Sequence, residues 1–196
     1  MTTRLPFLLV TIALCVLPAC GDHRAKRDDV LKDRATEIDK LRSDAEQGTA
    51  EDQYNLGVRY EGGMVVPQDY QEAARWYRLS AIQGYPDAQY KLCELSNRGQ
   101  GVPQDYQEAL RWCGLAADQG HGRAMFTLGV HYHTARGVSK DLVRAHMWYN
   151  LAAANGYDGG KTWRDRLADK MTPAQITEAQ KLAREWNVRM SSAIAK

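Results

Sequence analysis

The chain repeats its hydrophobic and polar positions every 36 residues through its middle. The glycines, tryptophans and aspartates that recur at this interval are Gly48, Gly84, Gly120 and Gly156; Trp76, Trp112 and Trp148; and Asp69, Asp105 and Asp141. The segments 66–73 and 102–109 carry the same residues in the same order. Several residue classes in one register indicate a repeated structural unit.

Each unit predicts two helices joined by a short turn. In the first unit, apolar residues at three-to-four spacing predict a helix over about residues 50–61, and glycines then mark a turn. The second helix begins at Asp69, whose carboxylate accepts amides of the first turn while Glu72 bonds back to the cap. Gly84 ends this helix, because glycine adopts the left-handed cap conformation at little cost.

Helical patterns flank the three units. Residues 30–48 predict an N-terminal amphipathic helix that resembles half a unit, and residues 157–196 predict a C-terminal helical cap. We place the repeats at residues 49–84, 85–120 and 121–156. The predicted fold is an all-α solenoid of three 36-residue helix-turn-helix repeats, with an N-terminal helix and C-terminal capping helices.

The amino-terminal end is typical of an export signal. Arg4 precedes an uncharged, mostly apolar run over residues 5–17, and a polar sequence follows from Asp22. Thirteen apolar residues are too few to span a bilayer, but they fit the central region of a signal peptide.

Residues 17–20, Leu-Pro-Ala-Cys, resemble a bacterial lipobox. This resemblance implies that residues 1–19 are a signal peptide and that Cys20 carries the lipid of a membrane anchor. Residues 20–29 are then a tether, and Gly21 after the cysteine resembles an outer-membrane address, facing the periplasm, in a Gram-negative cell. The alternative is simple secretion after ordinary cleavage.

The charge balance narrows the classes of partner. The chain has 196 residues, with 26 Lys and Arg against 24 Asp and Glu, and 44% of its residues are hydrophobic. This composition excludes a fully disordered chain, and the length is sufficient for a sizeable core. Because the basic residues form no block, we expect no nucleic-acid partner.

The repeat unit is similar to the Sel1-like repeat, a relative of the tetratricopeptide repeat. The shared pattern, over about residues 45–156, is A-x-x-x-L-G-x-x-Y-x-x-G-x-G-V-x-x-D-x-x-x-A-x-x-W-Y-x-x-A-A-x-Q-G. The resemblance implies that first helices line a concave groove, which binds an extended or helical peptide. The groove residues that it implies are Tyr54, Val58, Glu61, Tyr90, Glu94, Asn97, Arg98, Phe126, Val130 and His133.

Two interpretations of these groove residues remain open. Tyr54, Tyr90 and Phe126 recur every 36 residues, which packing between repeats explains as well as ligand contact does. Glu94 and Arg98 vary between the units and are better candidates for specificity, although a solvated face predicts the same variation.

Cys93 and Cys113 depart from the pattern in the middle repeat. Cys93 stands where the other units have glycine, and Cys113 stands where they have tyrosine. By the family resemblance the two helices pack face to face, so the exchanges compensate each other in volume. Outside the cytoplasm the thiols can also oxidise. A disulfide and a pair of buried free thiols are both consistent with the sequence.

The sequence contains no recognisable catalytic motif. We find no G-x-S-x-G, S-x-x-K, H-E-x-x-H or P-loop pattern. His131 and His133 are two residues apart, so on a helix they project about 200° apart and cannot share an ion. We therefore expect no catalytic residue, metal or cofactor.

The sequence predicts a non-enzymatic adaptor or scaffold. It would be tethered to the membrane through Cys20 and would bind a protein or peptide of the cell envelope in its groove. One alternative is β-lactamase or penicillin-binding activity, as described for cysteine-rich Sel1-like relatives. The other is a purely structural envelope lipoprotein.

Overall fold

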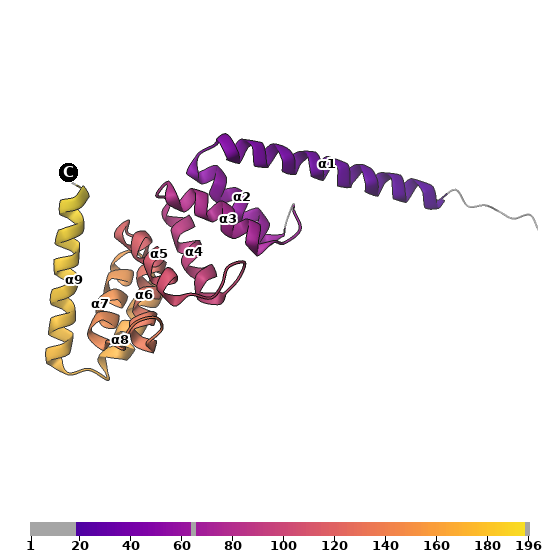
Figure 1. Cartoon of the computed structure of the whole chain (residues 1–196). Helices are drawn as coiled ribbons and strands as arrows, with labels where there is room; N and C mark the ends of the chain where they lie inside the picture. Colours follow the sequence, from indigo (N-terminus) through magenta and orange to yellow (C-terminus); the bar gives the residue numbers. More distant parts are fainter. Residues whose placement is uncertain (1–18, 64–65, 195–196) are drawn as a thin grey trace, which may run out of the picture. The chain divides into compact units, whose positions relative to one another are not determined.

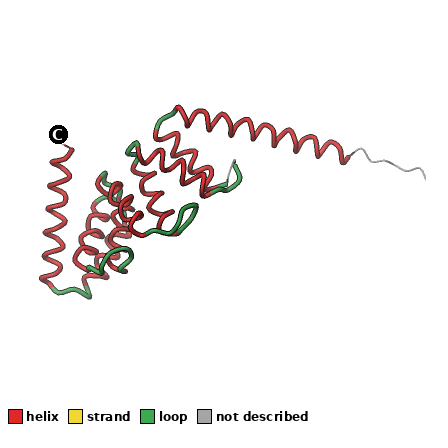
Figure 2. The backbone as a smooth tube through the Cα atoms, in the orientation of Figure 1, coloured by secondary structure: helices red, strands yellow, loops and turns green. Residues whose placement is uncertain are grey.

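The computed structural model describes residues 19–63 and 66–194, in which helices are joined by short loops and there is no strand (Figures 1 and 2). They form two compact units that divide between Glu37 and Ile38. The nine helices of these residues are α1 (Ala19–Gln47), α2 (Ala50–Gly62), α3 (Tyr70–Ile82), α4 (Pro86–Arg98), α5 (Tyr106–Asp118), α6 (Gly122–Thr134), α7 (Leu142–Ala154), α8 (Asp158–Ala168) and α9 (Pro173–Ile194).

Three helix pairs in the second unit repeat every 36 residues. Helix α2 packs on α3, α4 on α5, and α6 on α7, and each of these helices has 13 residues. Successive pairs stack because α3 also packs on α4 and α5 on α6. The predicted all-α solenoid of three helix-turn-helix repeats is confirmed.

An aspartate caps the second helix of each repeat. Asp69 Oδ1 accepts the N–H groups of Gln71 and Glu72 at 2.8 and 3.1 Å, and Asp105 is bonded in the same way. The predicted bond from the Glu72 side chain back to the cap is wrong. The Asp69 N–H donates instead to the carbonyl of Tyr60 at 2.9 Å, which ties the cap to the end of the preceding helix.

The two helices of a repeat approach closely where the first helix carries glycine. A Cβ atom on Gly57 would lie 2.6 Å from the ring of Tyr77, and one on Gly129 would lie 2.6 Å from the ring of Tyr149. Both rings are fully buried. The missing side chain therefore provides the space that the tyrosine ring fills, and the interior is close-packed there.

In the first two repeats a buried glutamine of the first helix, Gln53 or Gln89, is bonded to a glutamine at the end of the second helix. Gln83 Nε2 donates to Gln53 Oε1, and Gln119 Nε2 donates to Gln89 Oε1, both at 2.8 Å. The amide groups of Gln53 and Gln89 also donate to a backbone carbonyl of the preceding helix at 3.2 Å. These buried polar groups are thus paired, as a low-dielectric interior requires.

Helix α9 follows α8 and packs along α7 rather than repeating the pairing of the earlier helices. Its start is capped reciprocally, because the N–H of Gln175 donates to Thr172 Oγ1 at 3.3 Å and the N–H of Thr172 donates to Gln175 Oε1 at 2.9 Å. The contact with α7 includes Trp186 against Trp148, with ring centroids 5.8 Å apart.

Helix α1 contains the predicted N-terminal helix at residues 30–48 up to Gln47, and residues 20–29 are helical as well. In the second unit, the Arg42 guanidinium donates to the hydroxyl of Tyr60 at 2.6 Å. Residues 1–18 of the predicted signal peptide lie outside the described residues. In the part of the chain that the structure describes, every helix is too short or too polar to cross a membrane.

Candidate functional site

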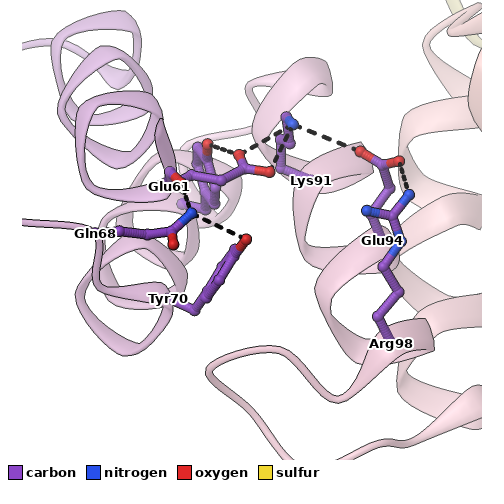
Figure 3. Close-up of polar contacts among 7 residues, drawn as sticks. Glu61, Gln68, Tyr70, Lys91, Glu94 and Arg98 are labelled. Carbon is purple, nitrogen blue, oxygen red and sulfur yellow. Dashed lines mark hydrogen bonds and ion pairs between the residues drawn. The ribbon is translucent and has the colours of Figure 1, made fainter. Parts of the chain in front are cut away.

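A chain of charged side chains crosses from α2 to α4 on the surface carried by α2, α4 and α6, which we call the first-helix face. Lys91 Nζ lies 3.0 Å from the carboxylate of Glu61 and 3.6 Å from that of Glu94. Arg98 continues the chain at 3.3 Å from Glu94. Figure 3 shows these residues and their contacts. Lys91, Glu61 and Glu94 are about three-quarters buried, so their side chains are held in position.

Tyr77 fixes the other end of this network. Its hydroxyl donates to Glu61 Oε2 at 2.5 Å. Burial and the Glu61 carboxylate raise the pKa of Tyr77 far above its ordinary value, so it stays a donor. Burial lowers the pKa of Lys91, but the hydrogen bond and charge of Glu61 outweigh this effect, and the pKa stands above its ordinary value. Lys91 therefore remains charged at neutral pH.

The turn before α3 is tied to the same region. Gln68 Nε2 donates to the carbonyl of Glu61 at 2.8 Å and to the hydroxyl of Tyr70 at 3.1 Å (Figure 3). Gln104 makes the corresponding bond to the carbonyl of Asn97 at 2.8 Å in the next repeat. The glutamine in each turn thus anchors the end of the first helix against the start of the second.

A polar cavity of about 360 Å³ opens on the first-helix face. It brings acidic, basic and aromatic side chains together with the backbone at the starts of α6 and α8. The residues that line it are Tyr54, Asp87, Tyr90, Lys91, Glu94, His121, Gly122, Arg123, Asn155, Gly156 and Tyr157. With both signs of charge and several hydrogen-bonding groups, the cavity suits a polar ligand such as a peptide segment.

Aromatic rings join successive repeats along this face. The ring centroids of Tyr54 and Tyr85 are 5.2 Å apart, and those of Phe126 and Tyr157 are 4.9 Å apart. Between them, Tyr90 stacks on His121 with centroids 4.6 Å apart. These contacts favour packing between repeats over ligand contact for the aromatic set, although Tyr90 also lines the cavity.

His121 has a defined protonation pattern. Its Nδ1 accepts the N–H of Ala124 at 3.2 Å and so caps α6. Its Nε2 lies 3.1 Å from Asp87 Oδ1. Because Nδ1 accepts, the proton is on Nε2 and is donated to the carboxylate. The ring therefore holds Asp87 at the edge of the cavity.

The Sel1 repeat model matches residues 50–85, 86–121 and 122–157. These matches cover more than half of the 196 residues. The chain belongs to the Sel1 repeat family. Sel1 repeat solenoids are typical of scaffolds for protein–protein interaction.

Two solved structures are similar to this Sel1 repeat chain. The first is c5321, a protective antigen of uropathogenic Escherichia coli strains, with 32% identity, a TM-score of 0.70, and coverage of 76% of this chain. The second is a Sel1 repeat protein from Oxalobacter formigenes, with 29% identity, a TM-score of 0.55, and coverage of 57% of this chain. The chain spans 32% and 45% of the lengths of these proteins. A search of curated proteins finds no match.

The Sel1 solenoid brings part of the predicted groove set together. Tyr54, Tyr90 and Glu94 line the cavity, while Glu61 and Arg98 reach it through the charged network. The remaining predicted residues lie elsewhere on the first helices: Val58, Asn97, Phe126, Val130 and His133. No observation here tests binding by any of the ten, so their role as binding residues stays a prediction.

The more distant predicted residues are mainly occupied with internal contacts. Val58, Val130 and Phe126 are partly buried against the core. His133 Nδ1 lies 3.3 Å from the hydroxyl of Tyr149, and burial lowers the pKa of His133. Asn97 donates to Cys93 Sγ at 3.6 Å. These contacts indicate a structural use for this end of the set.

Sequence reasoning missed Lys91, Asp87 and Arg123 as cavity residues. A signal for Lys91 was available, because it precedes Glu94 by three residues on a helix and such pairs share one face. Asp87 and Arg123 occupy the same repeat position with opposite charges, 36 residues apart. In the described residues, no group of three or more His, Cys, Asp or Glu is arranged to hold a metal ion.

The structure joins Cys93 and Cys113 by a disulfide, with an S–S distance of 2.11 Å. Their Cα atoms are 5.3 Å apart, and both residues are fully buried. The bond connects α4 to α5 at the level where Gly57 faces Tyr77 in the first repeat. The side chain of the predicted lipidation residue, Cys20, lies outside the described residues.

Proposed function

We propose that the chain is a membrane-tethered adaptor of the cell envelope that binds a protein or peptide on its first-helix face. The observation that carries this proposal is the network of Glu61, Lys91 and Glu94, which is largely buried and reaches the cavity. Ionic side chains that are already fixed lose little further entropy when a partner binds.

The mixed charge of the cavity supports a polypeptide partner. Asp87 and Glu94 offer acceptors, and Lys91 and Arg123 offer donors, within one cavity of about 360 Å³. An extended peptide presents both backbone donors and backbone acceptors, and its side chains can add either charge. The arrangement thus selects for a segment with paired charges rather than for a simple anion or cation.

We propose the lipid anchor from the amino-acid sequence alone. The lipobox-like residues 17–20 place the anchor on Cys20, and Gly21 favours the outer membrane of a Gram-negative host. Such an anchor would hold the repeats at the membrane surface, where the partner would be another envelope protein.

The binding proposal is tested by affinity capture from solubilised envelope. The test variant carries Glu94→Lys and Arg123→Glu, which reverse two charges of the cavity without changing the net charge. The control variant carries Glu178→Lys and Arg184→Glu on exposed positions of α9. We expect a stoichiometric partner that the control retains and the test variant loses, with helical circular dichroism unchanged in both. Equal capture by both variants would exclude the first-helix face.

The tether is tested separately by metabolic labelling with palmitate. We expect the chain to incorporate the label and to sediment with membranes, and Cys20→Ala to do neither. A Cys20→Ala chain that sediments like the unmodified one would remove the lipid anchor from the proposal and leave the binding result untouched.

A further inference from the structure

The opposite surface, carried by α3, α5 and α7, has two grooves in the same repeat register; we call this surface the second-helix face. The α3/α5 groove of about 490 Å³ is lined by Gln71, Ala74, Arg75, Arg78, Gly101, Val102, Pro103 and Glu108. The α5/α7 groove of about 740 Å³ includes the residues 36 positions further on, namely Gln107, Leu110, Arg111, Gly114, Val138 and Arg144. The two grooves can therefore be compared position by position within the same chain.

An ion pair spans the α3/α5 groove but has no counterpart in the α5/α7 groove. Arg78 of α3 lies 2.8 Å from the carboxylate of Glu108 of α5. The equivalent positions in the next groove are Gly114 and Arg144. Gly114 thus lacks the long side chain of Arg78, and Arg144 has a guanidinium group where Glu108 has a carboxylate. The α5/α7 groove is consequently wider and positively charged at this point.

The floor of the α5/α7 groove is apolar. Leu110 takes the place of Ala74 of the first groove, and Trp148, Leu182, Trp186 and further apolar side chains of α6, α7 and α9 complete the lining. Leu110, Trp148 and Leu182 are only partly buried. Burying their exposed surface against a partner would be favourable by the hydrophobic effect.

Three guanidinium groups stand around this floor: those of Arg111, Arg144 and Arg189. Arg111 lies over the ring of Trp112, with 4.3 Å from Cζ to the ring centroid, so its position is fixed. Its nearest carboxylate in the described residues, Glu108, is 3.9 Å away, and Arg144 is 3.5 Å from Asp141. Both arginine side chains are more than half exposed, so these contacts leave the guanidinium groups accessible.

One acidic side chain, Asp118, also lines the α5/α7 groove. The lining itself thus carries three guanidinium groups and one carboxylate, while Glu108 and Asp141 lie beside Arg111 and Arg144 at its margin. An occupant with several carboxylates and with apolar side chains between them complements both features. A fatty acid brings a single carboxylate, which can pair with only one of the three arginines. The number of arginines thus favours a polypeptide.

We propose that the α5/α7 groove docks an acidic, amphipathic segment of a partner protein, at a site separate from the first-helix face. Apolar side chains of the segment lie on Leu110, Trp148 and Leu182, and its carboxylates pair with Arg111, Arg144 and Arg189. The α3/α5 groove, which is spanned by its own ion pair, does not take part.

The test uses the full chain and a fluorescent peptide of about three helical turns, with Leu on one face and Glu on the other. A second peptide has Lys in place of every Glu. We expect saturable binding of the Glu peptide that weakens with added salt, and none of the Lys peptide. Equal binding of both peptides, or binding of neither, would overturn the proposal, as would preference for anionic lipid vesicles over the Glu peptide.

Matched variants locate the site. Arg111→Glu with Arg144→Glu should weaken binding at least about tenfold, whereas Arg75→Glu with Arg78→Glu in the other groove should change it less than about twofold. A third variant, Gly114→Arg with Arg144→Glu, copies the ion pair of the α3/α5 groove and should also abolish binding. If the circular dichroism of this variant is native, its loss of binding does not come from unfolding. Unchanged binding by the first and third variants would refute the site.

Discussion

The middle repeat and its two neighbours fill the same space between their helices in different ways. In the first and third repeats, Gly57 and Gly129 face the fully buried rings of Tyr77 and Tyr149. In the middle repeat the corresponding residues are Cys93 and Cys113, which form a disulfide. A small residue opposite a large one has become two residues of intermediate size with a covalent bond.

This difference shows that the helix spacing is a property of the pair, not of either residue. Glycine alone would leave a cavity opposite cysteine, and tyrosine alone would collide with a cysteine side chain. The helices pack in all three repeats because both positions change together. Single substitutions at these positions should therefore be far more damaging than paired ones.

The largest effect is expected for Tyr77→Cys. The substitution empties a fully buried position, and large-to-small changes of this kind lower the free energy of unfolding by about 3–5 kcal/mol. Adding Gly57→Cys should recover a large part of this loss under oxidising conditions, because it recreates the cysteine pair of the middle repeat. Urea unfolding followed by circular dichroism measures both. A double variant as unstable as the sum of the two single variants would show that the positions are not coupled.

Breaking the disulfide should have the next largest effect. The 20-residue separation of Cys93 and Cys113 corresponds to a stabilisation of about 3 kcal/mol in the chain-entropy model. Reduction should lower the urea midpoint accordingly. Peptide mapping without reductant should recover the peptides of the two cysteines as one linked species. Finding them as separate free-thiol peptides would leave the middle repeat without its covalent link.

Removing the tyrosine hydroxyl should have a smaller effect on stability, and the size of this effect should differ between the first and third repeats. Tyr77→Phe removes a 2.5 Å hydrogen bond to the Glu61 carboxylate, and bonds to charged groups contribute about 1.5–3 kcal/mol. Tyr149→Phe removes only a 3.3 Å contact with His133, so it should cost less than about 1 kcal/mol. Chemical unfolding of the two variants compares them directly, and equal losses would contradict this ranking.

The smallest effect that we expect is a loss of stability at acidic pH, caused by histidines of the third repeat. Burial lowers the pKa values of His131, His133 and His146 below the ordinary 6.5. The unfolded chain therefore binds more protons than the folded chain once the pH falls below about 6.5. Stability should change little between about pH 7 and 8 and should decrease from about pH 6.5 to 5. His131→Gln with His146→Gln should flatten this decrease in urea titrations, while a profile that stays as steep would assign it to other groups.

The sequence predicts the fold well because its pattern is periodic. Helix boundaries, aspartate caps and the number of repeats all follow from residues that recur every 36 positions. The bond predicted from Glu72 to the cap failed for a tertiary reason. The Asp69 N–H already has a partner in the carbonyl of Tyr60, and a pattern within one helix does not contain that contact.

The candidate site is less accessible to sequence reasoning. Lys91 joins Glu61 to Glu94 across two helices, and only the stacking of the first repeat on the second brings these side chains together. The positions that repeat, such as Tyr54 and Tyr90, turn out to contact the next repeat. The positions that differ between repeats, such as Asp87 and Arg123, give the cavity its charges. In a repeat chain, therefore, departures from the pattern are the better guide to a site.

The range of the hydrogen bonds has a consequence for folding kinetics. Between the helices of the second unit, side-chain hydrogen bonds recur at separations of 30 residues, as in Gln53 with Gln83, Lys91 with Glu61, and Gln89 with Gln119. Contact order is accordingly low, which favours fast folding, and any repeat can nucleate and recruit its neighbours. Each repeat thus forms its hydrogen bonds with its direct neighbours. A whole repeat of 36 residues could therefore be added or removed without changing the contacts within the remaining repeats.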